Sequence, residues 1–179
     1  PSTDHECSNF DEVLEKLRTG MRILLRVGSA ANDIDKVLSE IVRRGLPTDN
    51  MMFCTDDKHI ENIREEGHIN CIARLAVKCG VDPVQAVKMA SYNAARAYGL
   101  KNIGAIAPGY KGDMVLFKDL KDFEVVQVFT RFGKPYEDKP TPMPIIPPAV
   151  FNSVHLPPLT LDSFALEAKE VMPVISLID

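Results

Sequence analysis

The chain has 179 residues, a formal net charge of −4 at neutral pH, and ordinary shares of hydrophobic (45%) and charged (26%) residues. This composition is typical of a soluble globular domain with a sizeable core. The acidic balance provides no basic stripe for a phosphate backbone, so nucleic acid is not expected as a partner. No apolar run is long enough to cross a membrane, and no membrane partner is expected either.

The N-terminus and the cysteines indicate the compartment. Residues 1–10, PSTDHECSNF, lack the basic and apolar regions of a secretory signal. The cysteines form no CxxC pair and are irregularly spaced, which is typical of reduced thiols in the cytosol. They are Cys7, Cys54, Cys71 and Cys79. We therefore expect a cytoplasmic protein in which these cysteines are packing residues.

The first part of the chain predicts helices that alternate with buried strands. Residues 9–20 place apolar side chains at helical spacing, and the apolar run over 21–27 is typical of a parallel strand. A second amphipathic helix is expected over 33–45. A second strand, over 50–54, runs directly into Thr55-Asp56-Asp57.

Two further helices are predicted, over residues 68–80 and 82–99. The second has a capping aspartate, a proline at its first position and a closing glycine. The order helix, strand, helix, strand, helix, at about 25 residues per unit, is typical of parallel α/β folds and matches the spacing in a β/α barrel. We therefore expect residues 1–100 to form units of such a barrel.

The pattern changes after residue 100. Short β-rich runs separated by glycine-containing turns predict a small antiparallel sheet over residues 101–138. Residues 139–160 are rich in proline and predict a linker or an extended wrap. We expect residues 161–179 to begin a further, truncated domain, with one strand over 171–178.

Two clusters carry the residue types of hydrolytic chemistry: residues 3–6 (TDHE) and 55–59 (TDDKH). Residues just past the strands of a barrel line the mouth of its active site, and His5 and Asp56 are two βα units apart, so they could share one site. Imidazole and carboxylate groups bind zinc, iron or manganese, which lower the pKa of a bound water. Spacing alone leaves a solvated histidine and a turn-forming Asp56-Asp57 pair as the commoner interpretation.

Arg26 and Ser29 flank the end of the strand that lies between these clusters. Both would therefore point to the same mouth. An arginine there could hold a substrate carbonyl or anion, or it could pair with Asp33 or Glu6. The sequence leaves these alternatives open.

Six stretches of the sequence resemble the adenine deaminases of the amidohydrolase superfamily and follow that family's order. They are residues 3–6, 26–30, 53–57, 67–70, 93–100 and 104–113. The resemblance covers about residues 1–155. It implies an α/β fold that comprises the C-terminal part of a (β/α)8 metal-dependent hydrolase barrel over 1–100 and part of a small β-sandwich over 101–138.

The resemblance also implies a reaction, the hydrolytic deamination of adenine to hypoxanthine and ammonia in purine salvage. His5 and Asp56 resemble metal ligands, Asp56 also resembles the proton-transferring group, and Asp57 resembles a neighbouring acid that contacts a purine nitrogen. The expected substrate-binding residues are Glu6, Arg26, Ser29 and Asp57. The implied cofactor is a divalent metal, manganese or iron, with zinc as an alternative, and the full-length enzyme is expected to be a homo-oligomer.

Parts of the superfamily's site have no match in the sequence. It contains no His-x-His pair, no upstream bridging residue and no strands one to five of the barrel. Two alternatives therefore stay open. The chain could belong to another amidohydrolase that acts on cyclic amides, similar to a dihydroorotase, or it could be a catalytically inert fragment that lacks the N-terminal metal ligands.

Overall fold

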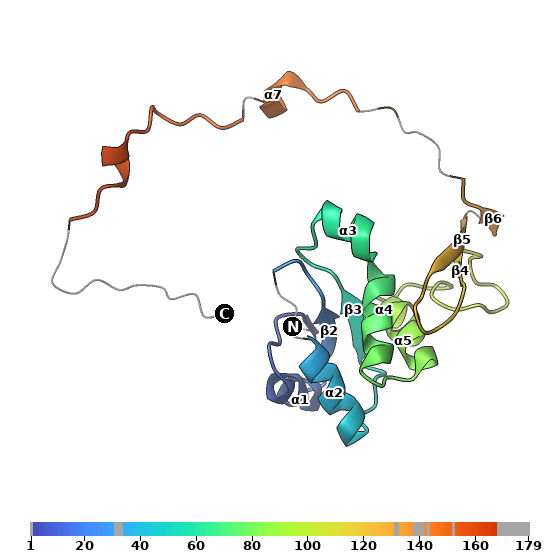
Figure 1. Ribbon diagram of the computed structural model, residues 1–179. Coiled ribbons are helices and arrows are strands. Elements are labelled where there is room, and N and C mark those ends of the chain that lie inside the picture. Colours follow the sequence, from blue (N-terminus) through green and yellow to red (C-terminus); the bar gives the residue numbers. More distant parts are fainter. Residues whose placement is uncertain are drawn as a thin grey trace. The chain divides into compact units, whose positions relative to one another are not determined.

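A computed structural model describes residues 2–30, 34–130, 133–137, 142, 144–151 and 153–167 (Figure 1). The chain divides into two units, residues 1–138 and residues 139–179. The first unit contains both sheets and the buried core.

The first unit begins with a parallel sheet in the order β1-β2-β3. Its strands are β1 (Thr3–Asp4), β2 (Arg22–Arg26) and β3 (Met51–Cys54). Strands β2 and β3 pair from Ile23 opposite Met51 to Arg26 opposite Cys54. Their carboxyl ends are therefore level, and the residues that follow β1, β2 and β3 emerge at the same edge.

Six helices connect and cover these strands. They are α1 (Phe10–Arg18), α2 (Ile34–Arg44), α3 (Ile60–Glu66), α4 (Ile69–Lys78), α5 (Pro83–Ala90) and α6 (Tyr92–Ala97). Local chemistry explains where two of them begin. The Asn9 side chain accepts a hydrogen bond from the Glu12 amide, and the Asp82 side chain accepts from two amides in the first turn of α5.

The core lies between the parallel sheet and its helices. Ile23 and Leu25 of β2 are buried, as are the first three residues of β3. The apolar stripes of α1, α2 and α4 join Ile23, Leu25, Met51 and Phe53 in one cluster. All four cysteines are free, and Cys7, Cys71 and Cys79 pack against this cluster.

The single helix predicted over residues 82–99 is wrong, because the structure breaks it at Ser91. Helix α5 ends at Ala90, and the Ser91 hydroxyl donates to the Val87 carbonyl at 2.7 Å. The backbone of Ser91 has φ −139° and ψ −73°, outside the helical region. The break lets Asn93 in α6 reach the start of β3, where its amide donates to the carbonyls of Thr48 and Met51 at 2.9 and 2.8 Å.

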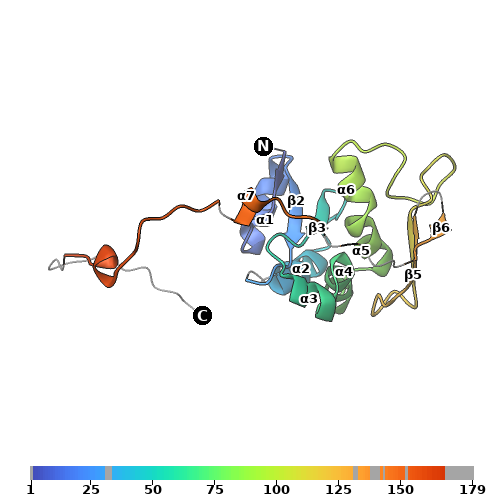
Figure 2. The same cartoon turned by 90° about the horizontal axis from the view of Figure 1, so that it is seen from above.

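A second, antiparallel sheet follows in the order β4-β5-β6. Its strands are β4 (Met114–Phe117), β5 (Val125–Thr130) and β6 (Lys134–Pro135). Helices α4 and α5 lie between the two sheets (Figures 1 and 2). Phe123, which is 1% exposed, packs edge-on against Phe117, and Arg74 of α4 donates to the Asp122 carbonyl.

The second unit has little regular structure among its described residues, namely helix α7 (Pro148–Phe151) and a 3₁₀ helix over Leu161–Phe164. The strand predicted over 171–178 lies outside the described residues. In the described part of the chain, no helix combines the length and apolar character needed to cross a membrane.

Candidate functional site

Three side chains of types that can bind a metal ion meet at the carboxyl edge of the parallel sheet. His5 and Glu6 follow β1, and Asp56 follows β3. The His5 Nε2 atom lies 3.2 Å from Glu6 Oε1 and 3.9 Å from Asp56 Oδ1. One ligand atom from each residue lies within 4.8 Å of the others. The structure thus brings together His5 and Asp56, which are far apart in the sequence.

Arg26, at the end of β2, bridges the two carboxylates from the other side. Its NH1 atom lies 2.7 Å from Asp56 Oδ2 and 3.1 Å from Glu6 Oε2. Its side chain is 20% exposed. Partial burial lowers the pKa of Arg26, but the hydrogen bond to Asp56 and the charges of nearby acids raise that pKa overall.

The structure shows one of the partners expected for Arg26, and its contact with a substrate stays a prediction. The structure shows the pair with Glu6 and adds one with Asp56, whereas Asp33 lies outside the described residues. Each carboxylate turns one oxygen to Arg26 and the other to His5. The oxygens on the histidine side therefore face the same point as the imidazole nitrogen.

This donor set fits a divalent cation. Imidazole nitrogen and carboxylate oxygen are ligands of zinc, iron and manganese, and three protein ligands with an open side are typical of catalytic rather than structural metal sites. All three residues are exposed, which leaves room for further ligands and a substrate. The sequence predicts Glu6 as a substrate-binding residue, which stays a prediction, and the structure adds Glu6 to this set of donors. Its position next to His5 was the available signal.

Asp56 has an unusual backbone. Its φ of 48° lies in the left-handed region, which non-glycine residues seldom adopt and which aspartate tolerates better than most. Such conformations concentrate at functional sites, where the surrounding structure holds them. Just before it, burial and the charge of Asp56 raise the pKa of the Cys54 thiol to about 11, so this thiol stays protonated near neutral pH.

Beside this cluster, the loop after β2, which contains Ser29, contacts the segment after β3, which contains Asp57. The Ala30 amide donates to Asp57 Oδ2 at 3.2 Å. The Ser29 hydroxyl donates to Asn62 Oδ1 at 2.6 Å and accepts from the His59 amide at 2.8 Å. The contacts of Asp57 and Ser29 therefore join the loop after β2 to the segment that follows β3.

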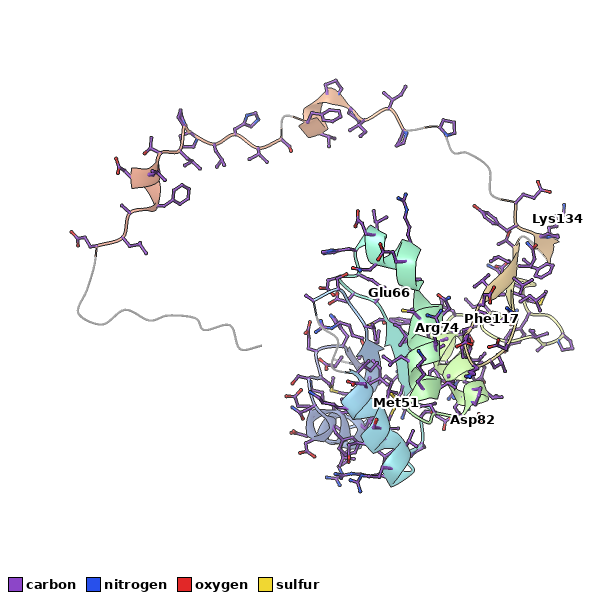
Figure 3. The ribbon with its side chains drawn as sticks, viewed as in Figure 1. Met51, Glu66, Arg74, Asp82, Phe117 and Lys134 are labelled. Atoms are coloured by element: carbon purple, nitrogen blue, oxygen red, sulfur yellow. The ribbon has the colours of Figure 1, made fainter. Side chains whose placement is uncertain are left out.

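Two further contacts at this edge were not expected from the sequence. The Thr55 hydroxyl lies 3.1 Å from Nε2 of His68, at the start of α4. Lys58 donates to Glu66 Oε2 at 2.6 Å, and its side chain is only 1% exposed. Glu66 lies where α3 meets α4 (Figure 3). Lys58 precedes α3, and side-chain pairs on a helix form three or four residues apart rather than eight, so spacing gave no signal for this pair.

Comparisons with known proteins agree with this geometry. The profile of the amidohydrolase family matches residues 22–134. The chain is 48% identical over 127 residues to an adenine deaminase from Kosmotoga olearia, which covers 71% of this chain and 22% of that protein. It is 36% identical over 181 residues to an adenine deaminase from Petrotoga mobilis, which covers 98% of this chain and 31% of that protein. The chain thus spans less than a third of the length of either relative.

Solved structures show a similar fold. The crystal structure of a β-aspartyl dipeptidase from Fervidobacterium islandicum AW-1 matches with a TM-score of 0.57 at 22% identity. The match covers 74% of this chain and 38% of that chain. At this identity the likeness concerns the fold alone.

Proposed function

The chain belongs to the amidohydrolase family, and from this membership we propose that it carries part of the active site of an adenine deaminase. The reaction is the hydrolysis of adenine to hypoxanthine and ammonia. The observation that carries the proposal is the convergence of His5, Glu6 and Asp56, from two strands of the sheet, on one point. The identity to adenine deaminases along nearly the whole chain supports the choice of substrate.

The finer architecture belongs to the same proposal. Strands β1, β2 and β3 are adjacent strands in the C-terminal part of a (β/α)8 barrel, and residues 101–138 form part of a small β-sandwich. Residues 139–160 link this region to a further domain that starts within 161–179. The parallel order β1-β2-β3, with helices between successive strands, supports the barrel.

The proposed cofactor is a divalent cation, manganese or iron, with zinc as the alternative. His5, Asp56 and Glu6 would hold it from this chain, and further ligands would come from the rest of the barrel. A bound cation supplies Lewis acidity and lowers the pKa of water at the site.

The acidic residues then have separate tasks. Asp56 accepts the proton of the attacking water and passes it to the leaving amine of adenine. Arg26 holds Asp56 Oδ2 at 2.7 Å, which fixes the orientation of the carboxylate. Asp57, next to it in the sequence, contacts a purine nitrogen and so positions the base. Glu6 and Arg26 line the substrate side of the site.

We also propose a compartment, a pathway and an assembly for the enzyme. The complete protein works in the cytoplasm, in purine salvage, as a homo-oligomer that binds a small neutral base. The acidic net charge supports a small molecule rather than a polynucleotide as substrate.

A chimera tests this function. This chain replaces the matching segment of the Petrotoga mobilis adenine deaminase, whose alignment covers 98% of it. With manganese, iron or zinc supplied, the chimera is expected to release ammonia from adenine, and H5A and D56N each to lower kcat/KM by about a thousandfold or more. The control D49N changes an acidic residue just before β3, at its amino end, and is expected to keep activity.

Other outcomes separate the alternatives. A folded, metal-loaded chimera that leaves adenine unchanged contradicts the proposal. If that chimera hydrolyses dihydroorotate instead, the enzyme acts on another cyclic amide. The isolated 179-residue chain is expected to be inactive under the same conditions.

A further inference from the structure

The Ser29 hydroxyl is engaged in protein contacts. It donates its single proton to Asn62 Oδ1 at 2.6 Å and accepts the His59 amide proton at 2.8 Å. His59 is the N-cap of α3, and Asn62 lies in its first turn. A substrate could take the hydroxyl proton only if the bond to Asn62 broke first.

Helix α3 depends on such contacts because none of its residues is buried. No apolar stripe anchors it, so its described links to the rest of the unit are polar. At its start Ser29 holds His59 and Asn62, and at its end the buried Lys58 holds Glu66 at 2.6 Å. Ser29 is therefore the tether between the first turn of α3 and the loop after β2.

The same loop holds Asp57. The Ala30 amide donates to Asp57 Oδ2 at 3.2 Å. On the other side of Ser29, Gly28 leaves room for the same carboxylate, because a Cβ atom at Gly28 would overlap Asp57 Oδ1. Ser29 thus sits between two contacts that fix the position of one carboxylate.

We infer that Ser29 is a positioning residue, which locks the loop Gly28–Ala30 to α3 and thereby orients Asp57 towards the purine. This inference rests on the proposed function, since the task of Asp57 is taken from it. Gly28 is required for the same reason, because any side chain there would displace the Asp57 carboxylate.

The first test measures hydrogen exchange in the 179-residue chain and needs no activity. In S29A we expect the Ala30 amide and the amides of α3 to exchange about tenfold faster, because one hydroxyl provides both tethering bonds. S29T keeps the hydroxyl and is expected to restore exchange to about twofold of the original rate. The matched control is S39A, since the Ser39 hydroxyl donates to the Asp35 carbonyl within its own helix and its other contact is with Cys79.

The second test uses the chimera with the Petrotoga mobilis enzyme. Because Asp57 binds the base equally in the ground and transition states, S29A and G28A should raise the KM for adenine by about tenfold while kcat changes by less than about twofold. S39A should leave both constants unchanged. A merely structural defect would instead lower the fraction of active enzyme and so reduce kcat.

The outcomes are separable from those of the proposed function. Unchanged exchange at Ala30 and α3 in S29A overturns the inference, whether or not the chimera is active. An inactive chimera with faster exchange in S29A counts against adenine deamination and leaves the positioning of Asp57 supported. An active chimera in which S29A lowers kcat and keeps KM also overturns the inference.

Discussion

At the residue scale, Asp4 ties the end of β1 to the neighbouring helix. Its Oδ2 atom accepts hydrogen bonds from Lys16 of α1 at 2.8 Å, from the Cys7 thiol at 3.2 Å and from the Glu6 amide at 3.2 Å. The bond from Lys16 is the largest cause that holds the pKa of Asp4 below its ordinary value. His5 and Glu6, two of the three metal donors, stand directly after this anchor.

The pH dependence of stability tests this anchor. Because the pKa of Asp4 is lowered on folding, its charge stabilises the fold above the ordinary pKa of about 4, and this contribution is lost as the pH falls towards the folded value. D4N is therefore expected to unfold at a lower urea concentration at pH 7, with the difference narrowing between about pH 5 and pH 3. A double-mutant cycle with K16M should show coupling at pH 7 that fades over the same range. Coupling that stays constant with pH would contradict this account.

At the element scale, Asn93 decides how α6 meets β3. Its side chain is 3% exposed and supplies protons to two backbone carbonyls that precede and begin the strand. Its Oδ1 atom has no partner among the described residues. Buried polar atoms are usually paired, and in this amide the nitrogen is the paired atom. Its two hydrogen bonds therefore hold the side chain in place.

We expect N93A to destabilise the chain by about 2–4 kcal/mol, because two carbonyls lose their donor in a buried setting. Urea unfolding followed by circular dichroism would measure this loss. The control is N50A at an exposed asparagine in the turn before β3, which is expected to change stability by less than about 0.5 kcal/mol. An N93A midpoint equal to that of N50A would show that these bonds add nothing to the fold.

At the scale of the whole molecule, the described part of the chain has an incomplete parallel sheet. β1 and β3 each pair on one side only, which leaves two free strand edges. Unpaired edges of this kind favour association with further strands. The proposed metal site is open in the same sense, because His5, Glu6 and Asp56 are all exposed.

The affinity of the isolated chain for a metal ion should be low, because the proposed site is open. We expect the 179-residue chain to bind Mn²⁺ with a Kd above about 1 µM, since three exposed donors from one side make an open site. H5A and D56N should abolish the calorimetric signal, whereas D49N, whose carboxylate pairs with Lys88, should keep it. A sub-micromolar Kd in the unmodified chain would mean that this chain alone holds a full ligand set.

Local sequence patterns are sufficient to predict most of the helices and strands of this protein. The cap at Asp82, the apolar stripes of α1 and α2, and the strands over 21–27 and 50–54 depend on neighbours within a few residues, and they matched the structure to within a few positions. Helix α3 was not predicted, and the helix predicted over 82–99 is two helices. The residues proposed for the site could be named from the sequence because each directly follows a strand. Only family resemblance, however, favoured a shared site over a turn and a solvated histidine.

The tertiary structure determines which side chains contact one another at the proposed site. Strand register places Arg26 opposite Cys54 and so brings its guanidinium between Glu6 and Asp56, a choice that spacing had left open. The break at Ser91 and the bond from Ser29 to Asn62 arise in the same way. The contacts of Arg26 and Ser29 join residues that lie tens of positions apart. The break at Ser91 replaces hydrogen bonds within a helix by the distant bonds that Asn93 makes. A local sequence pattern cannot predict these contacts, because the residues that make them come together only once the sheet has assembled.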